Sequence, residues 1–195
     1  YVANMNQIFA ELSIDLDVET VSGVLDEAAK LMENVVAPTN RGGDIAPSFL
    51  KDGKGTTSEG FKNAFDQYTQ GGWQGLSHPE EVGGQGLPKL VSTAVIEMLN
   101  SANLSFALCA LLTDGATEAL LTAGSEEHKQ LFIPRMLTGE WTGSMNLTEP
   151  QAGSDLALVR TRAEPQADGT FKVFGTKIFI TYGDHDLAEN IVHLV

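Results

Sequence analysis

Two short strings in the second half of the chain carry residue types suited to chemistry. The first, Leu147–Asp155, reads LTEPQAGSD and follows a run that alternates like a strand. Backbone N–H groups and hydroxyls in such a loop can bind a ligand rich in acceptors, such as a phosphate or a flavin ring. The plain structural interpretation is a strand-ending turn, with Gly153 at positive φ and Asp155 capping locally. The residues alone leave both interpretations open.

The second string, Lys177–Thr181, reads KIFIT. Alternation along a strand would put Phe179 and Thr181 on one face. An aromatic ring beside a hydroxyl is usually part of a core and its rim. The same pair can also cover a flat heterocycle and hydrogen-bond to it.

Other candidate sites are weaker. The loop Gly83–Lys89 suggests a phosphate loop, but Pro-Lys-Leu stands where a Walker sequence needs Gly-Lys-Ser or Gly-Lys-Thr. No GxSxG string occurs. Cys109 lies in an apolar run, so we expect a small buried hydrophobic residue. We expect no metal site, since none of the histidines has metal-ligand spacing: His78, His128, His185 and His193.

Composition narrows the class of protein. The 195 residues are 42% hydrophobic and 19% charged, which is enough to build a core. The net charge of −14 disfavours nucleic acids and anionic membrane surfaces as partners. The apolar run Phe106–Leu112 is too short to span a membrane, and no signal peptide opens the chain, so we expect a cytoplasmic protein. Both ends look cut, because the first residue is Tyr1 and the last residues are apolar.

Helical periodicity dominates the first part of the chain. Apolar residues from Val18 to Val36 recur every three or four positions and predict an amphipathic helix stopped by Pro38. A loop is expected over Arg41–Gly55, followed by a capping box of Thr56 and Glu59. Four further helices are expected: Phe61–Tyr68 ending at Gly71-Gly72, one opening at Pro88, an apolar central one over Leu104–Ala123 ending at Gly124, and one opened by Ser125 with Glu126 and Glu127.

Strand periodicity begins after Gly139. Alternating runs predict strands over Trp141–Thr148, Val159–Glu164 and Phe171–Thr181, and a further strand over Ile191–Val195. Asp168-Gly169 is expected to turn between the second and third. The predicted fold is α+β by segments: an all-α helical bundle over residues 1–138, then over 139–195 the first strands of an incomplete β-barrel-like domain.

These residues resemble a known family. Met145–Asp155 followed by Lys177–Thr181 resembles the flavin-binding signatures of the acyl-CoA dehydrogenases. Pro79–Gly86 is similar to their Gly-rich loop, and Glu126–Gly139 to the helix that leads into their β-domain. The longer N-terminus resembles an extended bacterial branch of the family. The resemblance covers most of the chain from about Val18 onward.

The resemblance implies FAD as the cofactor and a role for each matching residue. It assigns the backbone of Met145 and Leu147 and the Thr148 hydroxyl to the pyrimidine edge of the flavin. It assigns the Thr181 hydroxyl to flavin N5. It assigns Gly153 and Ser154 to the pyrophosphate and the mouth of the acyl-CoA channel, where Ser154 can also touch substrate. It assigns Phe179 and its neighbour Ile180 to packing against the flavin. Two departures stand out: Met145 replaces an aromatic residue of some members, and Gln151 stands where many have glycine.

The implied activity is α,β-dehydrogenation of an acyl-CoA thioester, with an electron-transfer flavoprotein or similar acceptor. In the family the glutamate base lies in a C-terminal helical domain, which is absent from residues 1–195, and assembly is homo-oligomeric. We interpret Glu149 as structural, because it follows a strand and precedes Pro150, and we do not assign it as the base. The fragment alone is therefore expected to be inactive. Two alternatives are an acyl-CoA oxidase or flavin monooxygenase of the same fold, and a non-catalytic helical interaction module.

Overall fold

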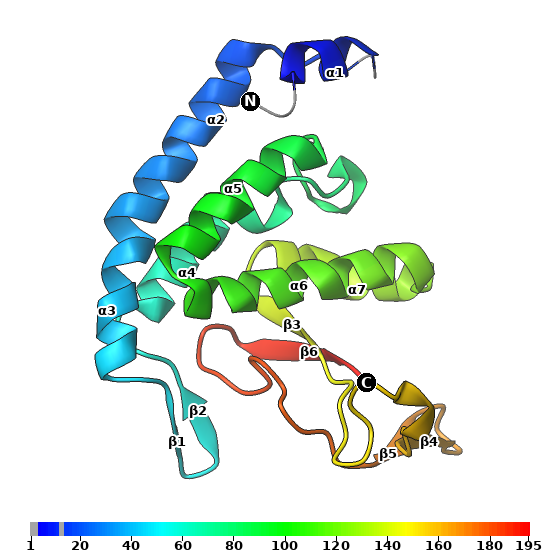
Figure 1. The fold of residues 1–195 in the computed structure, drawn as a ribbon. Helices are drawn as coiled ribbons and strands as arrows, with labels where there is room; N and C mark the ends of the chain where they lie inside the picture. Colours follow the sequence, from blue (N-terminus) through cyan, green and yellow to red (C-terminus); the bar gives the residue numbers. More distant parts are fainter. Residues whose placement is uncertain (1–3, 12–13) are drawn as a thin grey trace.

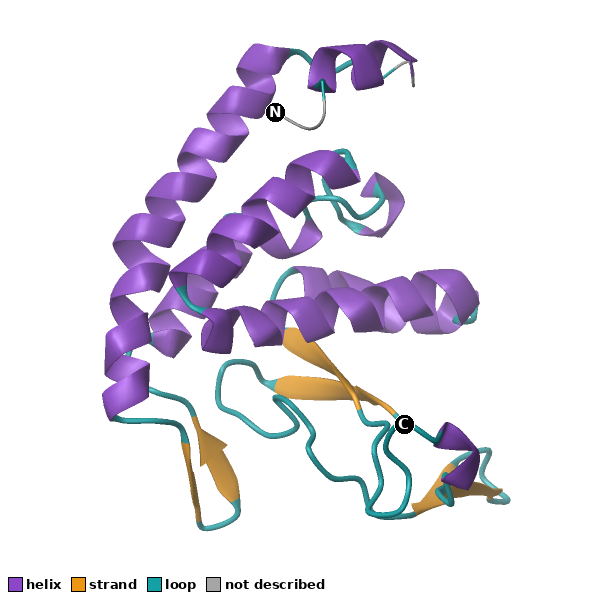
Figure 2. Ribbon diagram, viewed as in Figure 1, coloured by secondary structure: helices purple, strands orange, loops and turns teal. Residues whose placement is uncertain are grey.

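A computed structural model describes residues 4–11 and 14–195 of the chain. Figures 1 and 2 show a layer of helices on one side and short strands with long loops on the other. The helices are α1 Met5–Glu11, α2 Val18–Leu31, α3 Ala37–Ile45, α4 Phe61–Gln70, α5 Lys89–Ala102, α6 Leu104–Ala123 and α7 Glu126–Leu137. The strands are β1 Phe49–Lys51, β2 Lys54–Thr56, β3 Trp141–Met145, β4 Arg162–Pro165, β5 Phe171–Phe174 and β6 Asn190–Leu194.

The predicted class, helices followed by strands, is confirmed, although the described strands form no closed barrel. They form three separate two-stranded sheets: β1–β2, β3–β6 and β4–β5. The division into domains at residue 138 stays a prediction. The change in secondary structure falls between the end of α7 and the start of β3.

The first helix does not stop at Pro38, so that prediction was wrong. A π-helical turn, Met32–Val36, joins α2 to α3, and Pro38 lies in the first turn of α3. Proline lacks an N–H and cannot make the usual helical hydrogen bond. In the wider turn before it, the Ala37 N–H donates to the carbonyl of Met32, five residues earlier. The Asn34 amide donates to the carbonyl of Lys30 at 2.8 Å. The helix therefore runs on through residues expected to be a loop.

The expected loop Arg41–Gly55 also contains the hairpin β1–β2, in which Phe49 pairs with Thr56. No capping box forms: the residue before α4 is Gly60, at φ 85°, and it makes no side-chain cap. The predicted starts and ends of the later helices are confirmed. Ser125 Oγ accepts from the His128 N–H at 3.2 Å, Gly71 ends α4 and Gly124 ends α6.

Helix α6 is the central helix of the layer, as expected. It packs on β3, α7, α5 and α3. The Phe106 ring meets Phe61 and Tyr68 edge-on, at centroid distances of 5.7 and 6.4 Å. Cys109 is buried as predicted, and burial raises the pKa of its thiol to about 12, so it is an inert core residue.

By length and composition alone, α6 also meets the criteria for a membrane-spanning helix. Only the shorter run Phe106–Leu112 was considered from the sequence, so the length of this apolar stretch was underestimated. One such helix is weak support for a membrane protein, because the core helix of a water-soluble fold passes the same test. Here α6 has that core position, packed between α5, α7 and β3.

Strand β3 joins the strand region to the helices. It pairs in parallel with β6, with Gly143 opposite Val192, and its three middle residues are buried. A Cβ added to Gly143 would lie 2.5 Å from the Ala116 Cβ and 3.3 Å from the Met136 Sδ. Glycine at this position therefore lets β3 lie directly on α6 and α7.

The later strands are shorter than predicted. The second begins at Arg162 instead of Val159, because Leu156–Leu158 forms a 3₁₀ turn. The third ends at Phe174, so Lys177–Thr181 lies in a loop and the expected common strand face of Phe179 and Thr181 does not exist. The turn at Asp168-Gly169 is confirmed, with Gly169 at φ 85°.

The close approach at Gly143 leads to a stability prediction. We expect Gly143→Ala to lower the free energy of unfolding by about 1–3 kcal/mol, because the added methyl overpacks the contact with α6. Urea denaturation of the whole protein measures this. Gly115→Ala, in α6 where a Cβ meets open space, is the matched control and should be neutral or stabilising. Equal stability of the two variants would contradict the close packing.

Candidate functional site

The two strings singled out from the sequence lie side by side in the structure. The Ile178 N–H donates to the carbonyl of Thr148 at 2.9 Å. Lys177 Nζ donates to the carbonyl of Leu147 and to Glu149 Oε1, both at 3.0 Å. Residues separated by a hairpin in sequence therefore form one continuous surface.

Glu149 is the centre of this contact. Its side chain is only 3% exposed and accepts from the backbone N–H groups of Arg160 at 2.9 Å and Thr161 at 3.0 Å. The Thr161 hydroxyl, Lys177 Nζ and the Gln151 amide also donate to it. These hydrogen bonds, from the Thr161 hydroxyl first and then the Arg160 N–H, lower the pKa of Glu149 far below its ordinary value. The carboxylate stays ionised, which supports a structural role.

The turn after Glu149 confirms one part of the structural interpretation and contradicts another. Asp155 Oδ1 accepts from the Ala157 N–H at 3.2 Å, so the local cap is confirmed. Gly153 was expected to have positive φ, but it does not, and a Cβ there would meet open space. The chain's own fold therefore does not require glycine at this position. Gln151 binds Glu149 and the carbonyl of Leu158, so this departure from the family pattern fastens the turn.

Phe179 has the least favourable environment of the candidate residues. Its ring is 87% exposed and its backbone has φ 57°, in the left-handed region that non-glycine residues rarely adopt. Neither feature stabilises an isolated chain. A flat ligand stacked on the ring would remove its apolar surface from water. Ile180, beside it, is half-buried, and its carbonyl accepts from the Gly183 N–H at 3.4 Å.

The remaining candidates leave polar and apolar groups facing outward. Met145 and Leu147 are 42% and 48% exposed. Within the described part of the chain, the structure shows no hydrogen bond to the hydroxyls of Thr148, Ser154 and Thr181. Ser154 and Thr181 are also exposed. Exposed apolar side chains beside free hydroxyls fit a ligand with a flat apolar ring and acceptor atoms. The residues present therefore suit a flavin.

Thr181 also lines an open pocket of about 530 Å³. Its apolar wall includes Phe49 and Leu50 of the hairpin β1–β2, Phe61 of α4 and Leu108 of α6. Further lining comes from hydroxyl residues of three segments: Ser48, Thr56, Thr57, Ser58 and Ser105. The pocket is therefore large enough for a small organic group and offers both apolar and polar contacts.

Two aspartates fasten the hairpin to the loop that carries Thr181. Asp184 Oδ2 accepts from the Gly55 N–H at 2.6 Å. Asp186 Oδ1 accepts from the N–H and the hydroxyl of Thr57, at 3.0 and 2.6 Å. Tyr182 adds a hydrogen bond from its hydroxyl to the carbonyl of Ser105 at 2.7 Å, and burial raises its pKa. The pocket wall is thus tied to α6 and to the hairpin.

His185 lies in the same wall and is buried in its neutral form. Its Nδ1 accepts from the Leu187 N–H at 3.0 Å, so the proton is assigned to Nε2, which lies 2.9 Å from the Thr142 hydroxyl. Burial lowers the pKa of His185, while the charges of Asp186 and Asp184 oppose that shift. Protonation would also place a hydrogen on Nδ1 against the Leu187 N–H.

Sequence reasoning missed the residues that support the site. Lys177 was recognised only as part of a string, and its ion pair with Glu149 was not expected. Asp184, Asp186 and His185 carried no signal, because their partners at Gly55, Thr57 and Thr142 are far away in sequence. The crowding of acidic residues and glycine after Thr181 indicates a polar loop, but it does not identify these contacts.

Comparison with known proteins identifies a family. The sequence model described as "Acyl-CoA dehydrogenase, N-terminal domain" matches residues 22–140. The chain is 50% identical over 189 residues to a 3-methylmercaptopropionyl-CoA dehydrogenase of Ruegeria pomeroyi, covering 97% of this chain and 32% of the relative. It is 37% identical over 182 residues to a butyryl-CoA dehydrogenase of Syntrophomonas wolfei, covering 91% and 30%.

The fold has solved counterparts. An acyl-CoA dehydrogenase of Bacillus anthracis, solved in complex with FAD, superposes with a TM-score of 0.75 and 25% identity, covering 92% of this chain and 28% of that one. The chain spans about a third of the length of the curated relatives described above.

The environment of His185 leads to a pH prediction. Because its folded pKa is lowered from 6.5, the unfolded state binds more protons below that pH, and the free energy of unfolding should fall as pH drops from 7.5 towards 5.5. Chemical denaturation across this range, in the wild type and in His185→Asn, measures the slope. The variant should show a flatter slope, whereas His128→Asn, at an exposed position, should keep the wild-type slope. An unchanged slope in His185→Asn would contradict the assignment.

Proposed function

The chain belongs to the acyl-CoA dehydrogenase family, and on that premise we propose that residues 1–195 supply the N-terminal helices and first strands of an FAD-dependent acyl-CoA dehydrogenase. The observation that carries the proposal is the contact between the two strings. It puts the exposed ring of Phe179 beside the loop that begins at Leu147. A flat cofactor would cover the ring and explain its unfavourable backbone angle.

FAD, when bound, accepts the hydride removed from the β carbon of the acyl group. In this proposal the Phe179 ring and Ile180 pack on the flavin, and the Thr181 hydroxyl donates a hydrogen bond to it. The backbone of Met145 and Leu147 and the Thr148 hydroxyl bind its polar edge. Gly153 leaves room for the backbone to approach the pyrophosphate, and Ser154 lies at the entry of the substrate. Support comes from the exposure of Met145, Leu147 and Phe179 and from the open space at Gly153.

The acyl group of the substrate is assigned to the pocket beside Thr181. Thr181 belongs to both the proposed flavin contact and the pocket wall, so a ligand in the pocket lies next to the flavin contact. The apolar side chains of Phe61 and Leu108 suit an alkyl or thioether chain. Because a relative with 50% identity is a 3-methylmercaptopropionyl-CoA dehydrogenase, a short thioether acyl-CoA is the first substrate to try.

The base that removes the α-proton is not Glu149 in this proposal. A general base needs a pKa near the working pH, and the hydrogen bonds to Glu149 shift its pKa in the opposite direction. From the family resemblance we propose that the glutamate base lies in a C-terminal helical domain, outside residues 1–195. The same resemblance supports an electron-transfer flavoprotein as acceptor and a homo-oligomer. The cytoplasmic location is proposed from the sequence alone.

Thr181 provides the direct test of the enzyme. In the whole protein, Thr181→Val should slow anaerobic flavin reduction by an acyl-CoA roughly tenfold, since it removes one hydrogen bond to the reacting ring. Stopped-flow absorbance measures the rate. Thr181→Ser keeps the hydroxyl and should recover most of it. A rate unaffected by the valine substitution would contradict the hydrogen bond assigned to Thr181, whereas no flavin reduction in the wild type would favour a helical interaction module.

A second prediction concerns the isolated fragment. Residues 1–195 alone should show no turnover of any acyl-CoA and should bind FAD weakly or not at all, because the proposed base and part of the flavin's surroundings come from elsewhere. Acceptor-dye reduction and FAD fluorescence titration measure the two properties. Measurable turnover by the fragment would contradict the assignment of the base.

A further inference from the structure

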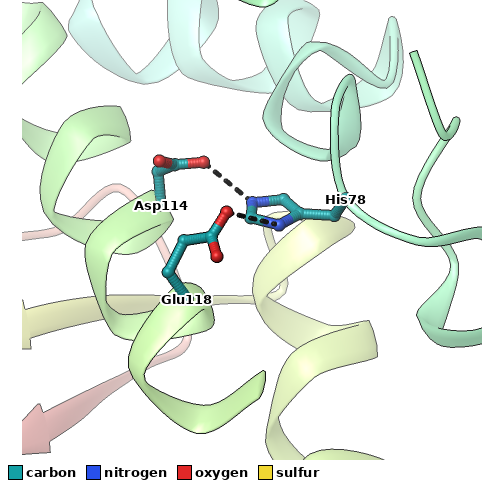
Figure 3. Close-up of side chains that lie close together, drawn as sticks. All are labelled: His78, Asp114 and Glu118. Atoms are coloured by element: carbon teal, nitrogen blue, oxygen red, sulfur yellow. Dashed lines mark ion pairs between the residues drawn. The ribbon is translucent and has the colours of Figure 1, made fainter. Parts of the chain in front are cut away.

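A second group of chemically capable side chains lies at the opposite side of α6 from the proposed flavin site. His78 Nε2 lies 2.8 Å from Asp114 Oδ1, and His78 Nδ1 lies 3.8 Å from Glu118 Oε1. Figure 3 shows the imidazole ring directed towards both carboxylates. One potential ligand atom from each residue lies within 4.8 Å of those from the other two. None of the three lines the pocket beside Thr181.

The Gly-rich loop holds His78 in place. The Gly86 N–H donates to the carbonyl of His78 at 2.9 Å, and the His78 N–H donates to the carbonyl of Gly75 at 3.2 Å. A Cβ on Gly84 would overlap the His78 carbonyl. The loop that resembled a phosphate loop therefore has a different role: it wraps the backbone of a buried histidine.

The carboxylates come from one face of α6. Asp114 and Glu118 are four residues apart, so their side chains lie one turn above each other. Their side chains are 31% and 43% exposed, whereas His78 is 1% exposed. The cluster thus has a buried nitrogen ligand on one side and access to solvent on the other.

His78 is poorly satisfied by the protein. Neither ring nitrogen makes a hydrogen bond of normal geometry with the described residues, although Asp114 Oδ1 is close to one of them. A buried imidazole without an aligned partner is costly, since the ring loses its bonds to water. A group bound between the ring and the carboxylates would supply the missing interaction.

We propose that His78, Asp114 and Glu118 bind a divalent transition-metal ion such as Zn²⁺. One imidazole nitrogen and two carboxylate oxygens are ordinary ligands of such ions, and the exposed side leaves positions for water. Magnesium is a poorer match, because it prefers oxygen ligands and does not favour imidazole. The ion would join the Gly-rich loop to α6 and stabilise the folded chain. Sequence spacing gave no sign of it, since His78 comes from a loop far from α6.

Lys89 competes with the ion. Its Nζ lies 2.6 Å from Glu118 Oε1, so the carboxylate has an ammonium partner when no metal is bound. A metal ion at the cluster would displace this exposed lysine. Removing the lysine charge should therefore strengthen metal binding, whereas it would weaken a cluster that exists only as an ion-pair network.

The test is calorimetric titration of the whole protein, treated with EDTA and dialysed, with ZnCl₂ and separately with MgCl₂. The wild type should bind one Zn²⁺ more tightly than Mg²⁺, and its Tm should rise with Zn²⁺. His78→Gln and Asp114→Asn should each weaken Zn²⁺ binding by at least about tenfold. Lys89→Met should tighten it severalfold. His128→Gln, which alters an exposed histidine outside the cluster, should leave the affinity unchanged.

Two results would overturn the proposal. One is the absence of saturable Zn²⁺ binding in the wild type. The other is binding that Asp114→Asn and Glu118→Gln leave intact, which would assign the ion to another site. The two carboxylate variants keep the buried histidine, so they remain informative if His78→Gln does not fold. FAD content, measured in the same samples, should be unaffected, which separates this result from the outcome for the proposed flavin site.

Discussion

A buried carboxylate, Glu149, organises the strand region of this chain. It accepts hydrogen bonds from the turn that follows it, from the backbone at Arg160 and Thr161, and from Lys177. The adjacent turn and two segments further along the chain are thereby brought to one carboxylate. The strands alone could not do this, because they form separate two-stranded pairs. The candidate flavin site therefore depends on a polar centre more than on a sheet.

The helical layer supplies the second constraint. Strand β3 can lie on α6 only because position 143 lacks a side chain, and α6 then faces the strand region on one side. The hairpin β1–β2 returns to this region through Asp184 and Asp186. A pocket thus forms where helix, hairpin and loop meet, with Thr181 in its wall. On its other side, α6 carries the carboxylates that face His78.

The sequence predicted what local periodicity and composition control. Helices with a clear apolar face, such as Phe61–Tyr68, and the apolar helix Leu104–Ala123 were found because burial imposes the pattern. The errors fall where tertiary contacts override a local rule. Pro38 was taken as a stop, but a π-turn carries the helix past it. Residues 177–181 were assigned to a strand, but the bonds to Leu147 and Glu149 hold them as a loop. The residues of the flavin signatures were identified by resemblance. Only the structure shows how these residues meet.

The most direct measurement is the FAD dissociation constant of Glu149→Gln in the whole protein, together with amide hydrogen exchange. If Glu149 builds the site, the variant should bind FAD more weakly, and the amides of Arg160 and Thr161 should exchange faster, with helical circular dichroism unchanged. Glu164→Gln, at an exposed position, should behave as the wild type. Wild-type FAD affinity in Glu149→Gln would contradict the account, because the two strings would then form the site without their central carboxylate.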